Sequence, residues 1–123
     1  MMDNADKIVY VVTHFKDSPE KAIIPFVLAN ATYAMDAQPV IIVQGEGVNL
    51  AVKGKAADIN HAPFDPLEKL FALYAEQGGQ LLVCSPCLKA RNYDEKDLVA
   101  NAKIVGAAKV IEEVTSAKTV LSY

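Results

Sequence analysis

Short runs of β-branched residues alternate along this chain with segments of helical period, and this alternation constrains the fold more than any other feature. The runs KIVYVVT (7–13) and PVIIVQ (39–44) predict strands buried on both faces, and QLLVC (80–84) predicts a third strand. AKIVG (102–106) and KTVLSY (118–123) predict two more strands, the first of them weakly. Strands that alternate with helices favour a mostly parallel five-stranded sheet covered on both faces, which is a three-layer α/β/α domain.

The first helix is predicted between the first two strands. Ser18 has the residue type of a helix N-cap, and Pro19 suits the first helical position. Apolar residues at helical spacing then continue to about Ala37. Pro25 lacks an N–H group, so we expect it to kink the first turns or to mark the start of the regular helix. Residues 53–64, farther along, have no period and predict a mobile or interface loop.

Three further helical segments follow. Asp65 is predicted to cap the second helix, which the Gly78-Gly79 pair should end. Asp94 is predicted to cap a third helical segment after the third strand. Residues 107–117, AAKVIEEVTSA, predict the last helix, immediately before the final strand. The whole chain, 1–123, is therefore expected to form one domain.

Composition and charge exclude several classes of function. The net charge is −3, which argues against nucleic-acid binding, because phosphate contacts need a surplus of lysine and arginine. No segment has the length and apolarity of a membrane span or a signal peptide, so we expect a cytoplasmic protein. Hydrophobic residues make up 52% of the chain against 22% charged, and this excess predicts apolar surface buried between subunits of a homo-oligomer.

The stretch LLVCSPCLKARNY (81–93) contains both cysteines, Cys84 and Cys87. In parallel sheets the ligand crevice lies at the carboxyl ends of the strands, and Cys84 is predicted to end the third strand there. A cytoplasmic cysteine pair is more often reactive or metal-binding than structural. The other candidate residues at this crevice are His14, Gly45, Glu46 and Gly47. Their glycines predict a tight turn that brings backbone N–H groups close to the crevice.

Two basic residues follow the cysteines closely, and the segment from Ser85 to Arg91 has no acidic residue. A nearby cation lowers the pKa of a thiol and favours the nucleophilic thiolate. We therefore expect Lys89 and Arg91 to make the turn electropositive and Cys84 reactive.

Other interpretations of the cysteines remain open. Cys84 can instead be a small buried hydrophobic residue at the end of a strand. A zinc site needs about four ligands, and His14 and His61 lack the spacing to complete one with the two cysteines, so no metal is predicted. A Cys-x-x-Cys pair before a helix is also typical of dithiol redox proteins.

Beyond these patterns, the chain resembles a known family. The segments DSPEKAIIPFVLANATYAMDAQPVIIVQGEGVNLA, LLVCSPCLKARNY and KIVGAAKVIEEVTSAKTVLSY, in this order and spacing, are similar to the DsrE/DsrF-like family, which includes TusD-type sulfur-relay proteins. The resemblance implies a compact α/β/α domain assembled as a trimer or hexamer. It also implies that Cys84 accepts sulfane sulfur as a persulfide from a donor protein and passes it to an acceptor protein, without a cofactor.

Cys87 departs from the TusD-type pattern and resembles small DsrE-like proteins with two cysteines in this turn. It is expected to act as an auxiliary or resolving thiol, and Lys89 and Arg91 to favour the thiolate. The alternatives are a dithiol redox protein that uses Cys84 and Cys87, and a non-catalytic oligomeric interaction module.

Overall fold

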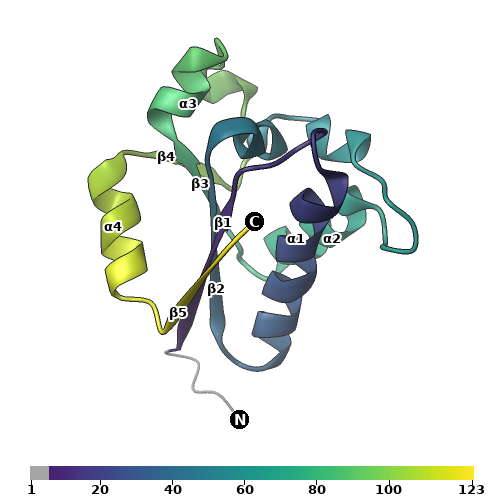
Figure 1. Cartoon of the computed structure of the whole chain (residues 1–123), viewed down its shortest axis with the longest axis vertical. Helices are drawn as coiled ribbons and strands as arrows, with labels where there is room; N and C mark the ends of the chain where they lie inside the picture. The colour runs from purple at the N-terminus through teal and green to yellow at the C-terminus, as the bar shows by residue number, and fades with distance from the viewer. Residues whose placement is uncertain (1–5) are drawn as a thin grey trace.

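The computed structural model describes residues 6–123, which form a five-stranded sheet with helices on both faces (Figure 1). The strands are β1 (Lys7–Val12), β2 (Gln38–Val43), β3 (Leu81–Cys84), β4 (Ala102–Val105) and β5 (Thr119–Ser122). They lie in the order β4-β3-β2-β1-β5, and every neighbouring pair is parallel. The predicted fold class is confirmed, and the sheet is parallel throughout.

Helices cover both faces of the sheet and one of its ends. The α-helices are α1 (Pro19–Ala34), α2 (Leu67–Glu76), α3 (Ser85–Ala90) and α4 (Ala107–Thr115), and the 3₁₀-helices are η1 (Gly45–Ala51), η2 (Lys55–Asp58) and η3 (Glu95–Asp97). Figure 1 shows α1 and α2 on one side of the sheet and α4 alone on the other, with α3 beyond the ends of the strands. The carboxyl ends of the central strands are therefore covered mainly by short helices.

Each central strand contributes to two cores, which explains why its sequence is apolar without alternation. Ile41 and Leu81 belong to the larger core beneath α1 and α2, whereas Ile42 and Leu82 belong to the smaller one beneath α4. Successive side chains of a strand point to opposite faces, so a strand between two helical layers must be apolar at every position.

The first helix agrees with its predicted start but not with its predicted end. Ser18 is the N-cap and Pro19 the first helical residue, although the Ser18 side chain makes no capping hydrogen bond. Pro25 is buried within one continuous helix, which neither begins nor breaks there. The helix ends at Ala34 rather than at about Ala37, because Asp36 adopts a left-handed backbone with φ of 62°.

The prediction that Asp65 caps α2 is wrong, whereas Asp94 is a cap as predicted, although of a helical segment only one turn long. Asp65 does not cap α2; Pro66 occupies the N-cap position, and the Asp65 carboxylate lies 3.8 Å from the Lys69 ammonium. Asp94 caps only the single turn η3, in a capping box with Asp97. No longer helix can form there, because the backbone of the following Val99 donates to the Ala51 carbonyl and extends along the end of η1.

The predicted loop over residues 53–64 contains regular structure. Lys55–Asp58 forms η2, and Ile59 after it is 1% exposed in the larger core. One buried apolar side chain therefore anchors a segment that has no sequence period.

A buried tyrosine joins α2 to the start of β3 and provides a test of the fold. The Tyr74 hydroxyl donates to the Gln80 carbonyl at 2.6 Å, and the ring is fully buried against Phe26. We expect Tyr74→Phe to lower the free energy of unfolding by about 1–3 kcal/mol, because it leaves a carbonyl without its partner. Urea denaturation measures this loss. Tyr33→Phe is the control, since no hydrogen bond of the Tyr33 hydroxyl occurs among residues 6–123, and an equal loss in both variants would contradict the prediction.

Candidate functional site

The two cysteines meet where β3 ends and α3 begins. Cys84 is the last residue of β3 and the N-cap of α3, and Cys87 lies in the first turn of this helix. Their sulfur atoms are 2.7 Å apart in a hydrogen-bonding contact, and both thiols are free and half-buried. The site is thus a dithiol at the carboxyl edge of the parallel sheet.

The segment after Cys84 is a short helix and not the open turn expected from the sequence. Ser85–Ala90 is only six residues long, too short for a clear apolar period. It is held to the domain by Leu88, which is 2% exposed in the larger core. Pro86 was the sequence signal for this helix, because proline is favoured in the first turn of a helix.

The glycines after β2 bring η1 against the ends of β1 and β3. Gly47 packs so closely on β1 that a Cβ atom would overlap the Val12 carbonyl. Gly45 has φ of +54°, a left-handed conformation that glycine adopts without strain. The Gly45 N–H group donates to Cys87 Sγ at 3.3 Å. The backbone of this turn therefore contacts Cys87.

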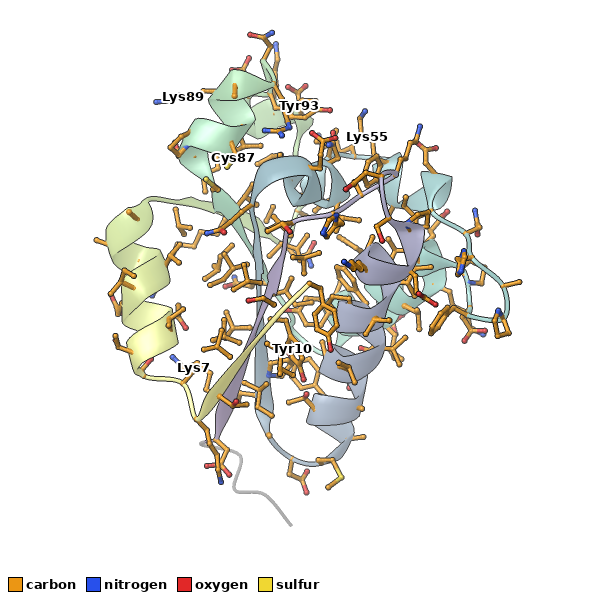
Figure 2. All side chains as sticks on the ribbon, viewed as in Figure 1. Lys7, Tyr10, Lys55, Cys87, Lys89 and Tyr93 are labelled. Atoms are coloured by element: carbon orange, nitrogen blue, oxygen red, sulfur yellow. The ribbon has the colours of Figure 1, made fainter. Side chains whose placement is uncertain are left out.

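Arg91 faces the site but is paired with an acid. Its Nε and Nη2 groups donate to one oxygen of Glu46 at 3.0 and 2.8 Å, and Nη1 donates to the Cys87 carbonyl at 3.1 Å. Arg91 lies four residues after Cys87, so both are on one face of the chain as it leaves α3. Lys89, two residues after Cys87, is exposed and points outward from α3 (Figure 2). The two bases therefore do not surround Cys84 with positive charge.

Burial controls the ionisation of Cys84. Loss of solvent around the sulfur raises the pKa of the Cys84 thiol, and the hydrogen bond with Cys87 raises it further. The charge of Arg91 lowers this pKa, but by less than burial raises it. Arg91 therefore lowers the pKa of Cys84 as expected but does not outweigh burial, because Glu46 pairs with it, and the overall pKa is raised rather than lowered.

His14 is not brought to the thiols. Its Nδ1 atom pairs with the Asp17 carboxylate in the loop that leads into α1. Within residues 6–123 it makes no hydrogen bond to either cysteine. His61 lies 4.0 Å from a Glu20 oxygen and stacks on Phe64.

Two residues missed by the sequence interpretation connect η1 to the chain after α3. The Tyr93 hydroxyl donates to Asn49 Oδ1 at 2.6 Å, and Asn49 Nδ2 donates to the Glu46 carbonyl at 2.9 Å. Asn49 is only 7% exposed. Both the NH₂ group and the oxygen of a buried amide need hydrogen-bond partners, so Asn49 fixes the positions of Glu46 and Tyr93 relative to each other. The sequence signal for this contact was an asparagine within the otherwise apolar segment VNLA (48–51).

The described part of the chain, residues 6–123, lacks two further features. It contains no group of three or more histidine, cysteine or acidic residues placed to hold a metal ion. It also has no helix with the length and hydropathy needed to cross a bilayer.

The raised pKa of Cys84 predicts how the rate of alkylation at this residue depends on pH. Only the thiolate is alkylated, so the rate at Cys84 should keep rising until the pH passes above the pKa of a free cysteine. Peptide mapping after iodoacetamide treatment at a series of pH values measures this midpoint. Cys87→Ala removes one cause of the shift and should move the midpoint down, although burial should keep it above the free value. A wild-type midpoint below that of free cysteine would refute the assignment.

Sequence comparison gives one curated relative at a low level of identity. Uncharacterized protein MJ0760 of Methanocaldococcus jannaschii is 28% identical over 102 residues, which are 83% of this chain and 37% of that protein. The chain therefore spans little more than a third of the length of this relative.

Two solved structures and a family model match almost the whole chain. The ychN protein from E. coli superposes with a TM-score of 0.80 at 17% identity, covering 96% of this chain and 99% of the other. MTH1491 from Methanobacterium thermoautotrophicum, described as a protein of unknown function, gives 0.68 at 14% identity with the same coverage of both chains. The family model matches residues 6–123. By this match, the chain belongs to the DsrE/DsrF-like family.

Proposed function

We propose that this protein carries sulfane sulfur, accepted on Cys84 as a persulfide and passed on to an acceptor. The observation that supports it most is the pair of free thiols in contact at 2.7 Å, at the edge of the sheet where α/β domains bind ligands. Membership of a family associated with sulfur relay favours sulfur as the cargo. Donor and acceptor proteins would deliver and remove it, and the reducing cytoplasm would keep the thiols free.

Loading requires no cofactor. The Cys84 thiolate attacks the sulfane sulfur of a donor R–S–SH, a new S–S bond forms, and the S–S bond of the donor breaks. The leaving RS⁻ takes the electron pair and the proton that Cys84 lost, which gives Cys84–S–SH and RSH. A thiolate of higher pKa is intrinsically the better nucleophile, so the raised pKa lowers the amount of reactive species but not its strength.

The contact between the two sulfur atoms supports a resolving role for Cys87. Its attack on Cys84 Sγ forms the Cys84–Cys87 disulfide and expels the outer sulfur as H₂S, with one S–S bond made and one broken. The Gly45 N–H group at 3.3 Å would stabilise negative charge on Cys87 during this attack.

Intact mass spectrometry after incubation with inorganic polysulfide tests the assignment. The wild-type protein should gain the mass of one sulfur atom at Cys84, and Cys84→Ser should lose this gain. Cys87→Ser is the matched variant, because it should load sulfur and retain it longer than the wild type does. A Cys84→Ser protein that loads sulfur as readily as the wild type would exclude Cys84 as the acceptor.

The same contact favours a second candidate function, a dithiol oxidoreductase. Two sulfur atoms at 2.7 Å need little movement to form a disulfide. In that case oxidant alone should produce the disulfide reversibly, Cys87→Ser should abolish it, and polysulfide should add no lasting mass to any variant. If both cysteines resist polysulfide and oxidant alike, the interaction-module alternative replaces both functions.

We also propose that the chain assembles with copies of itself. Edge strand β5 is exposed on both faces, with Val120 36% and Leu121 38% exposed, which leaves apolar side chains in solvent. Sedimentation equilibrium should give a mass several times that of one chain, and Leu121→Lys should lower it. A single-chain mass at all concentrations tested would contradict this proposal.

A further inference from the structure

Cys84 lines a pocket that is separate from its contact with Cys87. The pocket has a volume of about 200 Å³ and lies between the start of α3 and the first turns of α4. Its walls are Gln44, Cys84, Pro86, Val105, Gly106, Ala107, Val110 and Ile111. Cys87 is absent from these walls, so the two thiols differ in what can reach them from this side.

No charged side chain contributes to the walls of this pocket. Two nearby cations are paired with acids, and Lys89 of α3 is exposed and is not part of the lining. Arg91 pairs with Glu46, and Lys109, although on α4, pairs with Glu113 at 3.0 Å. Gln44 is the single polar side chain in the lining. A ligand group that enters the pocket therefore exchanges water for mainly apolar contacts.

The start of α4 is a feature of the lining that would attract an anion. Gly106 and Ala107 bring the first backbone N–H groups of this helix to the pocket. A helix N-terminus stabilises an exposed negative charge by only about 0.3–1 kcal/mol. An oxyanion that gives up its hydration without a cationic partner loses more than that.

We propose that this pocket receives the organic group of an uncharged sulfane-sulfur donor, such as an organic trisulfide, and selects against anionic donors such as thiosulfate. The reaction at Cys84 rests on the proposed sulfur-carrier function. The selectivity of the pocket is inferred from its lining residues and does not depend on that function. The burial that raises the pKa of Cys84 agrees with an apolar surrounding.

The reaction with such a donor is balanced without an oxidant. The Cys84 thiolate attacks the central sulfur of R–S–S–S–R, and the bond from that sulfur to one outer sulfur breaks. The leaving RS⁻ takes the electron pair and the proton from Cys84. The products are Cys84–S–S–S–R, with one R group in the pocket, and RSH.

Charge-matched thiol reagents test the pocket without any transfer of sulfane sulfur. Methyl methanethiosulfonate is neutral, and its sulfonatoethyl analogue is anionic. Each rate at Cys84, located by peptide mapping on the wild-type protein, is divided by the rate of the same reagent with free N-acetylcysteine. The thiolate fraction of Cys84 is the same for both reagents, so the ratio reports the pocket and not the pKa.

We expect the neutral reagent to be favoured at Cys84 by at least about tenfold, which corresponds to about 1.4 kcal/mol of lost hydration. Ile111→Lys places a cation at the rim, where the side chain is 59% exposed, and should raise the relative rate of the anionic reagent several-fold. Leu73→Lys is the matched control on α2, across the sheet and 46% exposed, and should leave the ratio unchanged.

Equal normalised rates, a faster anionic reagent, or no adduct at Cys84 with either reagent would overturn the pocket selectivity. Treatment with an organic trisulfide is measured separately, as the mass of the mixed trisulfide at Cys84. If Cys84 prefers the neutral reagent but forms no mixed trisulfide, the selectivity of the pocket is supported and the trisulfide is overturned as the donor. If Cys84 takes up sulfur from inorganic polysulfide but does not prefer the neutral reagent, the inference about the pocket is overturned and the proposed function remains intact.

Discussion

The hydrogen bond that Cys87 receives from η1 depends on how closely η1 approaches the strand ends. Gly47 fits against the Val12 carbonyl only because it has no side chain, and Gly45 turns the chain through a left-handed conformation. Together they place an N–H group 3.3 Å from Cys87 Sγ. The two cysteines lie three residues apart in the chain, but the N–H group that contacts Cys87 comes from a segment 42 residues away, so the surroundings of the dithiol depend on the packing of η1.

Electrostatics at the site is local and largely compensated. Glu46 takes two hydrogen bonds from Arg91, so the cation nearest to the cysteines contributes little net charge. Burial then dominates the ionisation of Cys84 and raises its pKa. A thiol of this kind reacts slowly with indiscriminate electrophiles at neutral pH, and its selectivity comes from what can reach it. The proposed selectivity for a donor is therefore assigned to the pocket wall and not to the cationic side chains.

Strand positions could be predicted from the sequence because burial on both faces forces every residue of a central strand to be apolar. Positions that depend on single contacts could not. The end of α1 is set by the backbone of Asp36, and the single turn η3 by the hydrogen bond from Val99 to Ala51. The charge of Arg91 could be read from its residue type, but its neutralisation by Glu46, 45 residues away, depends on the tertiary fold. The same holds for α3, because six residues do not complete a helical pattern.

The proposal that Cys84 is the residue that carries sulfur is best tested on the protein as it is isolated from cells. Intact mass analysis followed by peptide mapping, without any added donor, reads the state of each cysteine. We expect a fraction of the molecules to carry one additional sulfur atom, located on Cys84 and removed by a reducing thiol. Unmodified thiols at both positions in every molecule, or additional sulfur on Cys87 alone, would contradict it.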